Sequence, residues 1–201
     1  MKAEKKIVLA SASPRRKQMF KDMGLPFEVI PADIDESIYP GETPVEFAVR
    51  TAGEKGMVVA TRLAGDGQRP WIVSADTIVV LDDDILTKPT NSSDAQAMLR
   101  RLSGRTHIVV TGWAVGRHED SWEARYTATD VTFHNLTEQQ IDGYVASGEG
   151  ADKAGSYAIQ GIGAFLVKQV NGCYFNVVGL PISEVVRVLL ERGALTEFLK
   201  P

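Results

Sequence analysis

Two hydroxyls and two guanidiniums follow the first apolar segment of the chain, IVLA. They belong to Ser11, Ser13, Arg15 and Arg16, with Pro14 between them. Ser13 followed by Pro14 is typical of a helix N-cap and a first helical residue. The first amides of a helix have no intrahelical partner, so together with these donors they could bind phosphate oxygens, although the spacing of a Walker-type P-loop is absent. The other interpretation is that Ser13 is only a cap and that both arginines are solvated.

A carboxylate interrupts the most strand-like segment of the sequence. Asp76 stands in the middle of WIVSADTIVVL, residues 71–81, among apolar and β-branched side chains. A carboxylate that is desolvated in such a place without a partner costs several kcal/mol. It could have a structural partner, or it could serve chemistry as a metal ligand or a general base. Because strand interiors rarely contain aspartate, we favour the chemical interpretation.

Other charged residues are less informative one by one. Asp33, Asp35 and Glu36 could supply oxygen ligands to a hard cation, but by themselves they are more simply a solvated loop. Lys55 in a helix and Lys88 before a proline are, by the same argument, ordinary surface lysines.

The usual metal and nucleophile motifs are absent. His107, His118 and His134 have no metal-ligand spacing, and the sequence contains no HExxH, CxxC or GxSxG. The sequence therefore argues against a zinc enzyme or a serine hydrolase of the usual kind. Residues 82–84, three aspartates, are predicted to be a polar hairpin turn without a role in the site, and Cys173, the only cysteine, is given none either.

Alternating strand-like and helix-like segments must position these residues. Predicted strands cover residues 7–10, 27–30, 71–81, a short return after 82–84, 107–116, 123–133, and one segment on each side of an Asn171-Gly172 turn. Predicted helices run from Pro14 to Gly24, from Thr43 past Lys55 towards Leu63, from Ser92 to Leu102, from Thr137 to Ser147, and onward from Pro181. Hairpins mixed with strand–helix alternation predict an α/β fold with a mixed sheet.

Composition narrows the class of protein. A chain of 201 residues suggests one domain, or two small lobes that share a sheet. The net charge of −4 argues against a nucleic-acid-binding protein. The apolar segment near the start is far too short for a signal peptide, and no segment approaches the ~20 apolar residues that cross a bilayer. We therefore expect a cytoplasmic protein that binds neither nucleic acid nor membrane.

Several short motifs, in this order and at these separations, give the chain a family resemblance. They are LASASPRR, the Glu54-Lys55 pair, SADT, Lys88-Pro89, LSGRTHIVVTG, DKAGSYAIQG and VVGLP. Together they resemble the Maf family of nucleotide pyrophosphatases, proteins once described as septum-formation inhibitors. The resemblance covers nearly the whole chain.

The resemblance implies an architecture and an activity. It implies an α/β fold with an elongated mixed sheet, flanked by helices, around a central cleft, related to the inosine triphosphate pyrophosphatases. Residues 1–201 would form a single domain, which could consist of two lobes around the cleft. The implied reaction cleaves a nucleoside triphosphate between the α and β phosphates with the help of Mg²⁺ or Mn²⁺, and a homodimer is expected. The family's older description suggests a rival, a non-catalytic nucleotide-binding regulator of cell division.

The resemblance also assigns residues to roles. Asp76 matches the family's proton acceptor and, with Glu36, would contact the metal. The residues that match triphosphate-contacting or site-shaping positions are Ser11, Arg16, Lys55 and Lys88, with Ser13 in the same loop.

A substrate-selecting set distinguishes two branches of the family. Arg15, Thr77 and Gln160 match the branch that acts on dTTP and UTP, rather than the branch that prefers 7-methyl-GTP. The amide of Gln160 offers both a donor and an acceptor, which suits the imide edge of thymine or uracil.

Overall fold

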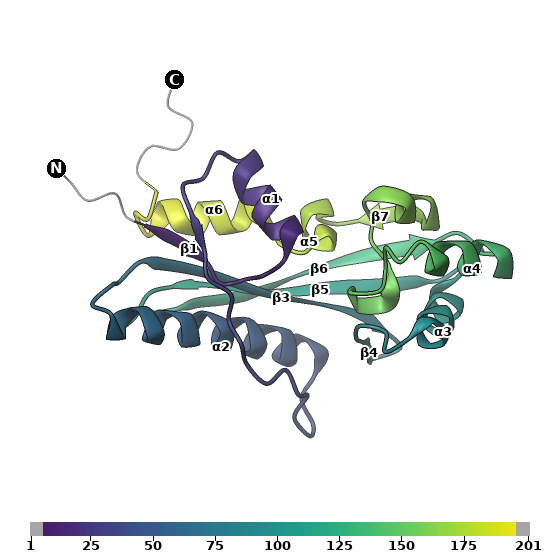
Figure 1. Cartoon of the computed structure of the whole chain (residues 1–201), viewed down its shortest axis with the longest axis horizontal. Helices are drawn as coiled ribbons and strands as arrows, with labels where there is room; N and C mark the ends of the chain where they lie inside the picture. Colours follow the sequence, from purple (N-terminus) through teal and green to yellow (C-terminus); the bar gives the residue numbers. More distant parts are fainter. Residues whose placement is uncertain (1–5, 196–201) are drawn as a thin grey trace. The chain divides into compact units, whose positions relative to one another are not determined.

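The computed structural model describes residues 6–195 as a mixed α/β fold with a seven-stranded sheet (Figure 1). The strands are β1 (Ile7–Leu9), β2 (Glu28–Val29), β3 (Trp71–Leu81), β4 (Asp84–Leu86), β5 (Thr106–Gly116), β6 (Glu123–Phe133) and β7 (Val167–Asn171). The helices are α1 (Pro14–Asp22), α2 (Pro44–Gly65), α3 (Ser92–Leu102), α4 (Glu138–Ala146), α5 (Tyr174–Val178) and α6 (Ile182–Glu191), with two 3₁₀ segments, η1 (Ala154–Ser156) and η2 (Gly161–Leu166). The sheet order is β2-β1-β3-β5-β6-β7, and β4 pairs with β3. The predicted α/β fold with a mixed sheet is confirmed.

The described residues divide into two compact units. Unit 1 contains the residues up to Asp76, Gly112–Tyr126, and those from Gly179 onward. Unit 2 contains Thr77–Thr111 and Thr127–Val178. The strands β3, β5 and β6 therefore each contribute residues to both units.

Local capping explains where the helices of unit 1 begin. Ser13 caps α1 and Pro14 is its first residue, as the sequence predicts. Thr43 and Glu46 form the predicted capping box of α2, in which each side chain accepts from the other residue's amide. Gly24, with a φ of 63°, follows the last turn of α1 in a left-handed conformation that glycine adopts without steric cost.

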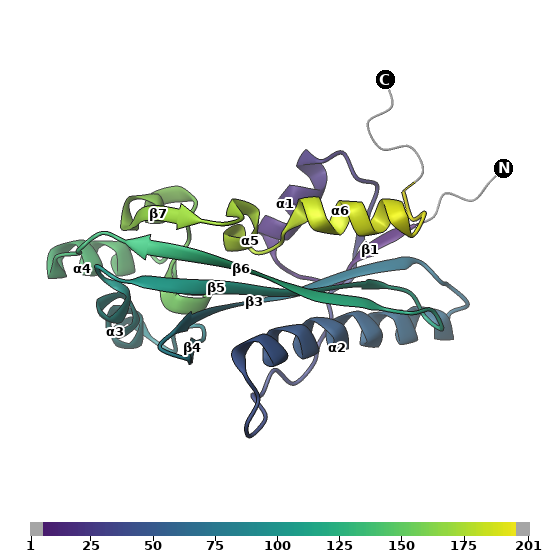
Figure 2. The same cartoon turned by 180° about the vertical axis from the view of Figure 1, so that it is seen from behind.

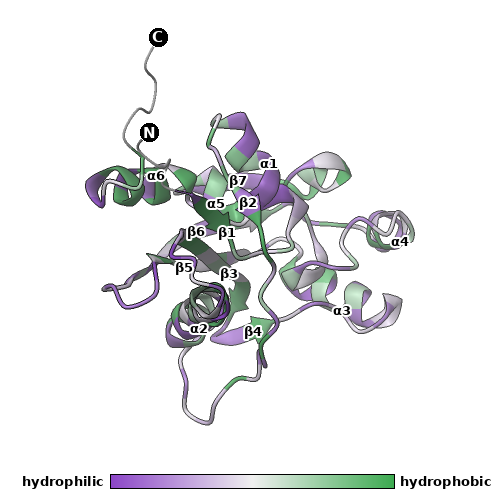
Figure 3. Ribbon diagram, turned by 60° about the vertical axis from the view of Figure 1, so that its left-hand side comes forward, coloured by the Kyte–Doolittle hydropathy of each residue, from purple (hydrophilic) through white to green (hydrophobic). Residues whose placement is uncertain are grey.

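Two layers of helices enclose the strands of unit 1. Helix α2 lies on one side of these strands, whereas α1 and α6 lie on the other (Figures 1 and 2). One core cluster joins α2 to the strands through Val8, Val59, Leu63 and Ile72, all buried. Figure 3 shows the strands as mostly hydrophobic, whereas α2 and α6 carry both hydrophobic and hydrophilic residues. The helices therefore bury one face against the sheet and expose the other.

Strand β1 pairs with only the first residues of β3. β1 pairs in parallel with residues Trp71 to Val73, and the amide of Ala10 still donates to the Val73 carbonyl oxygen. The next carbonyl on the same edge of β3 belongs to Ala75, since alternate residues of a strand face the same neighbour. β1 has ended at this point, so Ala75 needs a partner of another kind.

Unit 2 has its own hydrophobic core and its own hairpin. The core includes Val79, Leu99, Val131 and Phe133 from strands and from α3, each with at most a few per cent of its surface exposed. β4 pairs antiparallel with the end of β3, and Asp82 and Asp83 take positive φ angles between the two strands. The prediction of a polar hairpin turn at residues 82–84 is confirmed.

The segment after the Asn171-Gly172 turn is a short helix, so the prediction of another strand there is wrong. Helix α5 covers residues 174–178, and Asn176 at its centre is fully buried. The side-chain nitrogen of Asn176, Nδ2, donates to the Val109 carbonyl oxygen and to the hydroxyl of Thr129, both at 2.9 Å. These tertiary contacts select a helical turn for a short apolar segment whose pattern fits a helix and a strand equally well.

The remaining predicted elements shift only at their ends. The strand expected at residues 27–30 is assigned at Glu28–Val29, although the amide of Ile30 still donates to the Leu9 carbonyl oxygen. Among residues 6–195, no helix combines the length and the apolarity that a membrane span requires.

Two glycines of unit 1 give opposite predictions for alanine substitution. A Cβ on Gly112 of β5 would overlap with the backbone of Ala48 in α2, which cannot move aside cheaply, whereas a Cβ on Gly53 of α2 meets nothing within 4 Å. We expect Gly112→Ala to lower the free energy of unfolding by roughly 1–3 kcal/mol, and Gly53→Ala to raise it by about 0.5–1 kcal/mol. Urea denaturation of both variants beside the wild type measures this. A Gly112→Ala protein as stable as the wild type would contradict the close packing of α2 on β5.

Candidate active site

The loop between β1 and α1 is organised by its hydroxyls. The Ser13 hydroxyl accepts from the Arg16 amide at 3.5 Å, and the Ser13 amide donates to the Ser11 hydroxyl at 3.3 Å. Ser13 is therefore a helix cap, as one of the two interpretations held. Ser11 is buried within the turn.

Arg16 is buried, so the interpretation that both arginines are solvated is wrong for this residue. Its guanidinium donates to the Ser11 hydroxyl at 3.0 Å, to the Ala75 carbonyl oxygen at 2.9 Å and to the Gly179 carbonyl oxygen at 2.7 Å. Arg16 thus supplies the partner that Ala75 lacks beyond the end of β1. The side chain holds three distant segments of unit 1 together beside Asp76.

Burial has a cost for this guanidinium. It lowers the pKa of Arg16 to about 10, although the nearby negative charge of Asp76 acts in the opposite direction. Arg16 therefore still carries its proton at neutral pH, and the charge of Asp76 helps to keep it there. Arg15, the adjacent guanidinium, is half-buried.

Asp76 has a charged partner from α2. The ammonium of Lys55 lies 2.8 Å from Oδ1 of Asp76 and 2.7 Å from Oε1 of Glu36. The side chains of Lys55 and Asp76 are each only 12% exposed, whereas that of Glu36 is 48% exposed. The interpretation of Lys55 as an ordinary surface lysine is therefore wrong.

The packing of α2 on β3 brings this pair together. The Ser74 hydroxyl donates to the Ala52 carbonyl oxygen of α2 at 2.6 Å, which places that face of β3 against the helix. Asp76 points to the same face, because side chains two apart in a strand lie on one side. Lys55 lies about one helical turn beyond Ala52, which is the spacing at which a side chain can reach along the same helix face.

A further arginine secures the loop that carries Glu36. Arg50 of α2 donates to both carboxylate oxygens of Glu42, at 2.6 and 2.8 Å, and to the Ser37 carbonyl oxygen at 2.9 Å. Its guanidinium also lies over the ring of Tyr39, 3.8 Å from the centroid. The sequence did not predict this role. The i, i+4 spacing of Arg50 and Glu54, which pair at 3.0 Å, indicates that pair but not the contacts with the loop.

The donor set around Asp76 suits only certain metals. Glu36 and Asp76 contact the same ammonium, so their carboxylates lie close to one another. Within the described part of the chain, no group of three or more His, Cys, Asp or Glu residues could hold a metal ion. A divalent ion here would therefore take one or two carboxylates and complete its shell with water and phosphate oxygens. That is the usual pattern for Mg²⁺ and differs from a closed protein cage.

Unit 2 carries the other predicted site residues. Side chains of successive strand residues point to opposite faces, so Thr77 faces away from the side that Asp76 faces. The Thr77 hydroxyl lies 2.9 Å from that of Thr111, which in turn donates to the Asn176 carbonyl oxygen at 3.2 Å. Lys88 and Gln160 are both exposed.

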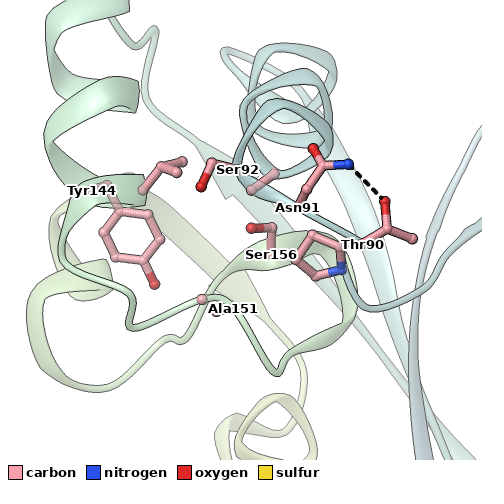
Figure 4. A pocket seen from close by; sticks show the side chains of 10 residues that line it. Thr90, Asn91, Ser92, Tyr144, Ala151 and Ser156 are labelled. Carbon is pink, nitrogen blue, oxygen red and sulfur yellow. Dashed lines mark hydrogen bonds between the residues drawn. The ribbon is translucent and has the colours of Figure 1, made fainter.

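Unit 2 brings the segment that precedes Gln160 next to the residue before Lys88. The amide of Gly155 donates to the carbonyl oxygen of Thr87 at 3.2 Å, and a Cβ on Gly155 would lie 3.0 Å from the side chain of Val79. A pocket of about 200 Å³ adjoins these segments (Figure 4). Its lining includes Pro89, Thr90, Asn91, Tyr144 and Ser156. The sequence carried no sign of this pocket.

The chain matches the family model described as Maf-like protein over residues 6–192. The chain belongs to this family. It is 48% identical over 190 residues to a protein of Nitratidesulfovibrio vulgaris named dTTP/UTP pyrophosphatase, covering 94% of this chain and 89% of that one. It is 50% identical over 190 residues to a protein of Myxococcus xanthus with the same name, covering 94% and 93%. The predicted Maf resemblance is confirmed.

A solved structure supports the fold of this Maf-like protein. The Ham1 protein of Staphylococcus aureus superposes with a TM-score of 0.56 at 15% identity, covering 94% of this chain and all of that one. At this identity the likeness concerns the fold alone. The substrate must be argued from the residues of the site.

The contacts of this Maf-like protein join its predicted site residues into two groups. Ser11, Ser13 and Arg16 form one hydrogen-bonded group, and Glu36, Lys55 and Asp76 form one ion-paired group. Both groups belong to unit 1. The hydrogen bond from Arg16 to the carbonyl oxygen of Ala75, the residue before Asp76, makes them neighbours in space. Thr77, Lys88 and Gln160 lie in unit 2, and Arg15 is adjacent to Arg16 in unit 1.

Removing the Arg16 side chain should destabilise this Maf-like protein. Arg16→Ala removes the hydrogen bonds to the carbonyl oxygens of Ala75 and Gly179, and the loss of a partner from a buried polar group costs about 1–3 kcal/mol. We expect the free energy of unfolding to fall by at least ~2 kcal/mol. Lys17→Ala is the control, since Lys17 is exposed on the same helix and should change stability by less than about 0.5 kcal/mol. Equal stabilities of the two variants in urea denaturation would show that Arg16 has no structural role.

Proposed function

We propose that the protein is a nucleoside triphosphate pyrophosphatase that hydrolyses dTTP and UTP to the monophosphate and pyrophosphate. The observation that carries the proposal is the Asp76–Lys55–Glu36 cluster next to a helix N-terminus rich in cationic and hydroxyl donors. Membership of the Maf-like family and the names of the related proteins from N. vulgaris and M. xanthus support the same activity.

Cationic groups would first hold the substrate. A triphosphate repels carboxylates, so Asp76 can act on it only if positive charge surrounds the phosphates. Lys55 and Arg16 supply charge in unit 1, together with Arg15 and the donors of Ser11 and Ser13. Lys88 is proposed to contribute from unit 2. Family membership, rather than an observed contact, is the support for that residue.

Asp76 would then act as the general base. Its carboxylate takes the proton of the attacking water, whose oxygen forms a bond to the α phosphorus; the bond from that phosphorus to the bridging oxygen breaks, and its electron pair leaves with pyrophosphate. The cations meet the charge that develops on the leaving group. The contact with the Lys55 ammonium fixes the orientation of the carboxylate.

We propose Mg²⁺ or Mn²⁺ as the metal, held by Glu36 and Asp76. When bound with the nucleotide, the ion would neutralise part of the phosphate charge and polarise the scissile bridge. Two carboxylates are a sufficient protein contribution, because the phosphates and water supply the other ligands.

Arg15, Thr77 and Gln160 are proposed to select the base. The exposed amide of Gln160 can donate to a carbonyl oxygen and accept from the imide N–H of thymine or uracil. Further parts of the proposal are that residues 1–201 act as one functional domain and that the protein forms a homodimer in the cytoplasm, without nucleic-acid or membrane partners.

The activity is tested with a panel of dTTP, UTP, CTP, ATP and GTP, with Mg²⁺, with Mn²⁺ and with a chelator, by measuring pyrophosphate. In the same assay Asp76→Asn should lower turnover by at least ~100-fold, because the general base is lost. Nucleotide affinity, measured by calorimetry, should change little. Asp83→Asn is the control, since Asp83 lies exposed in the hairpin turn with a φ of 66° that asparagine tolerates.

The outcomes separate the two candidate functions. Near-normal turnover of Asp76→Asn would require a different base. Binding of dTTP by the wild type without pyrophosphate release from any nucleotide would favour the rival, a non-catalytic regulator of division.

Exchanging the selecting set should change the substrate ranking. In the combined variant Arg15→Trp, Thr77→Gln and Gln160→Glu, we expect the preference to move away from dTTP and UTP, because a glutamate cannot donate to the pyrimidine carbonyl oxygen. The ratio of kcat/KM values across the panel measures this. An unchanged ranking would show that selectivity resides in other residues.

A further inference from the structure

One carboxylate, that of Glu149, accepts hydrogen bonds from two backbone amides just after Gln160. Glu149, which follows α4, accepts from the Ile162 amide at 2.9 Å through Oε1 and from the Gly163 amide at 2.7 Å through Oε2. Each oxygen therefore has its own amide, and the two bonds fix both the position and the orientation of the backbone just after Gln160.

A tyrosine connects this carboxylate to the other side of Gln160. The hydroxyl of Tyr144 accepts from the Ala158 amide at 3.0 Å and donates to the Glu149 carboxylate. The backbone is thus held two residues before Gln160 by Tyr144 and two residues after it by Glu149. All of these groups lie within unit 2.

The glycines of this segment are needed for the contact. Gly161 has a φ of 73°, and a Cβ on it would overlap with Oε1 of Glu149. A Cβ on Gly163 would overlap with the Ala158 carbonyl oxygen. The spacing Gln-Gly-Ile-Gly therefore allows the carboxylate to approach the backbone closely.

The carboxylate is charged in this setting. Burial alone would raise the pKa of Glu149, but the amides of Gly163 and Ile162 and the hydroxyl of Tyr144 hold it below its ordinary value. An ionised carboxylate accepts from all three donors at neutral pH, which a protonated one could not do.

Gln160 itself is exposed, whereas the two residues before it are buried. Ala158 and Ile159 are 6% and 9% exposed. The direction in which the Gln160 side chain leaves the surface is therefore set by the backbone that Glu149 and Tyr144 hold.

We propose that Glu149 and Tyr144 are positioning residues that orient Gln160 for selection of the pyrimidine base. This inference rests on the proposed function. A merely structural role predicts that changes at Glu149 affect all nucleotides equally, whereas the positioning role predicts an effect that passes through Gln160.

A double-mutant cycle tests the proposal. Glu149→Gln is nearly isosteric but turns one acceptor into a donor that faces a backbone N–H. With dTTP and UTP we expect kcat/KM to fall about tenfold or more, since small misplacements of a contacting group have effects of this size. In a Gln160→Ala background the same substitution should change kcat/KM by less than about twofold, because coupled residues are not additive.

Two more variants keep the test decisive. Tyr144→Phe removes only the hydroxyl and should shift the substrate ranking in the same direction as Glu149→Gln, so it replaces that variant if the latter does not fold. Glu138→Gln is the control, because Glu138 is an exposed residue of the same helix whose partner is Arg100, and kcat/KM should stay unchanged.

Each outcome decides between the claims. A wild type that releases pyrophosphate, combined with additive effects of Glu149→Gln and Gln160→Ala, overturns the positioning role alone. A wild type that releases no pyrophosphate overturns the proposed function and this inference with it. Hydrogen exchange gives a readout besides activity: the amides of Ile162 and Gly163 should lose protection in Glu149→Gln, and unchanged protection would contradict the contact itself.

Discussion

A carboxylate within a buried strand must have a cationic partner, and this requirement organises the region around Asp76. Unpaired, Asp76 would oppose folding, because desolvation of an ion costs more than a single strand residue contributes. The Lys55 ammonium compensates it only because α2 is docked with Ala52 over Ser74, one turn from Lys55. The same ammonium brings in Glu36 from a loop, and Arg50 secures that loop to α2. The cluster that we propose for catalysis is thus also a folding constraint.

The second constraint is the early end of β1. A longer first strand would satisfy the edge of β3 with backbone hydrogen bonds. Instead the chain turns into α1, and the guanidinium of Arg16 takes over the carbonyl oxygen of Ala75. A side chain in this place supplies positive charge that a backbone amide could not supply to the same degree. The guanidinium of Arg16 therefore both satisfies the carbonyl oxygen and supplies positive charge. Its burial lowers its pKa to about 10.

Local signals predicted most elements, and long-range contacts account for what they missed. The caps at Ser13, Thr43 and Thr137 and the turn at residues 82–84 depend on neighbours in sequence, so the pattern alone located them. The sequence pattern predicted a strand at helix α5, because the side-chain amide of Asn176 donates to residues that are distant in sequence, Val109 and Thr129. In the candidate site, the motifs indicated Asp76 and Lys55 individually. The sequence did not predict the pairing of Asp76 with Lys55, the contacts of Arg50 with the loop, or the contacts of Glu149. In each case the residues are distant in sequence, and no spacing pattern indicates that they are in contact.

In the proposed arrangement, the residue that selects the substrate is separate from the residues that fix the local fold. A side chain that must recognise a base has to be exposed, and an exposed glutamine on a glycine-rich segment would lose its orientation to conformational entropy. Glu149 restricts that freedom through hydrogen bonds to two backbone amides, those of Ile162 and Gly163. The exposed residue and the carboxylate that holds its backbone are therefore two separate positions in the chain, at Gln160 and Glu149.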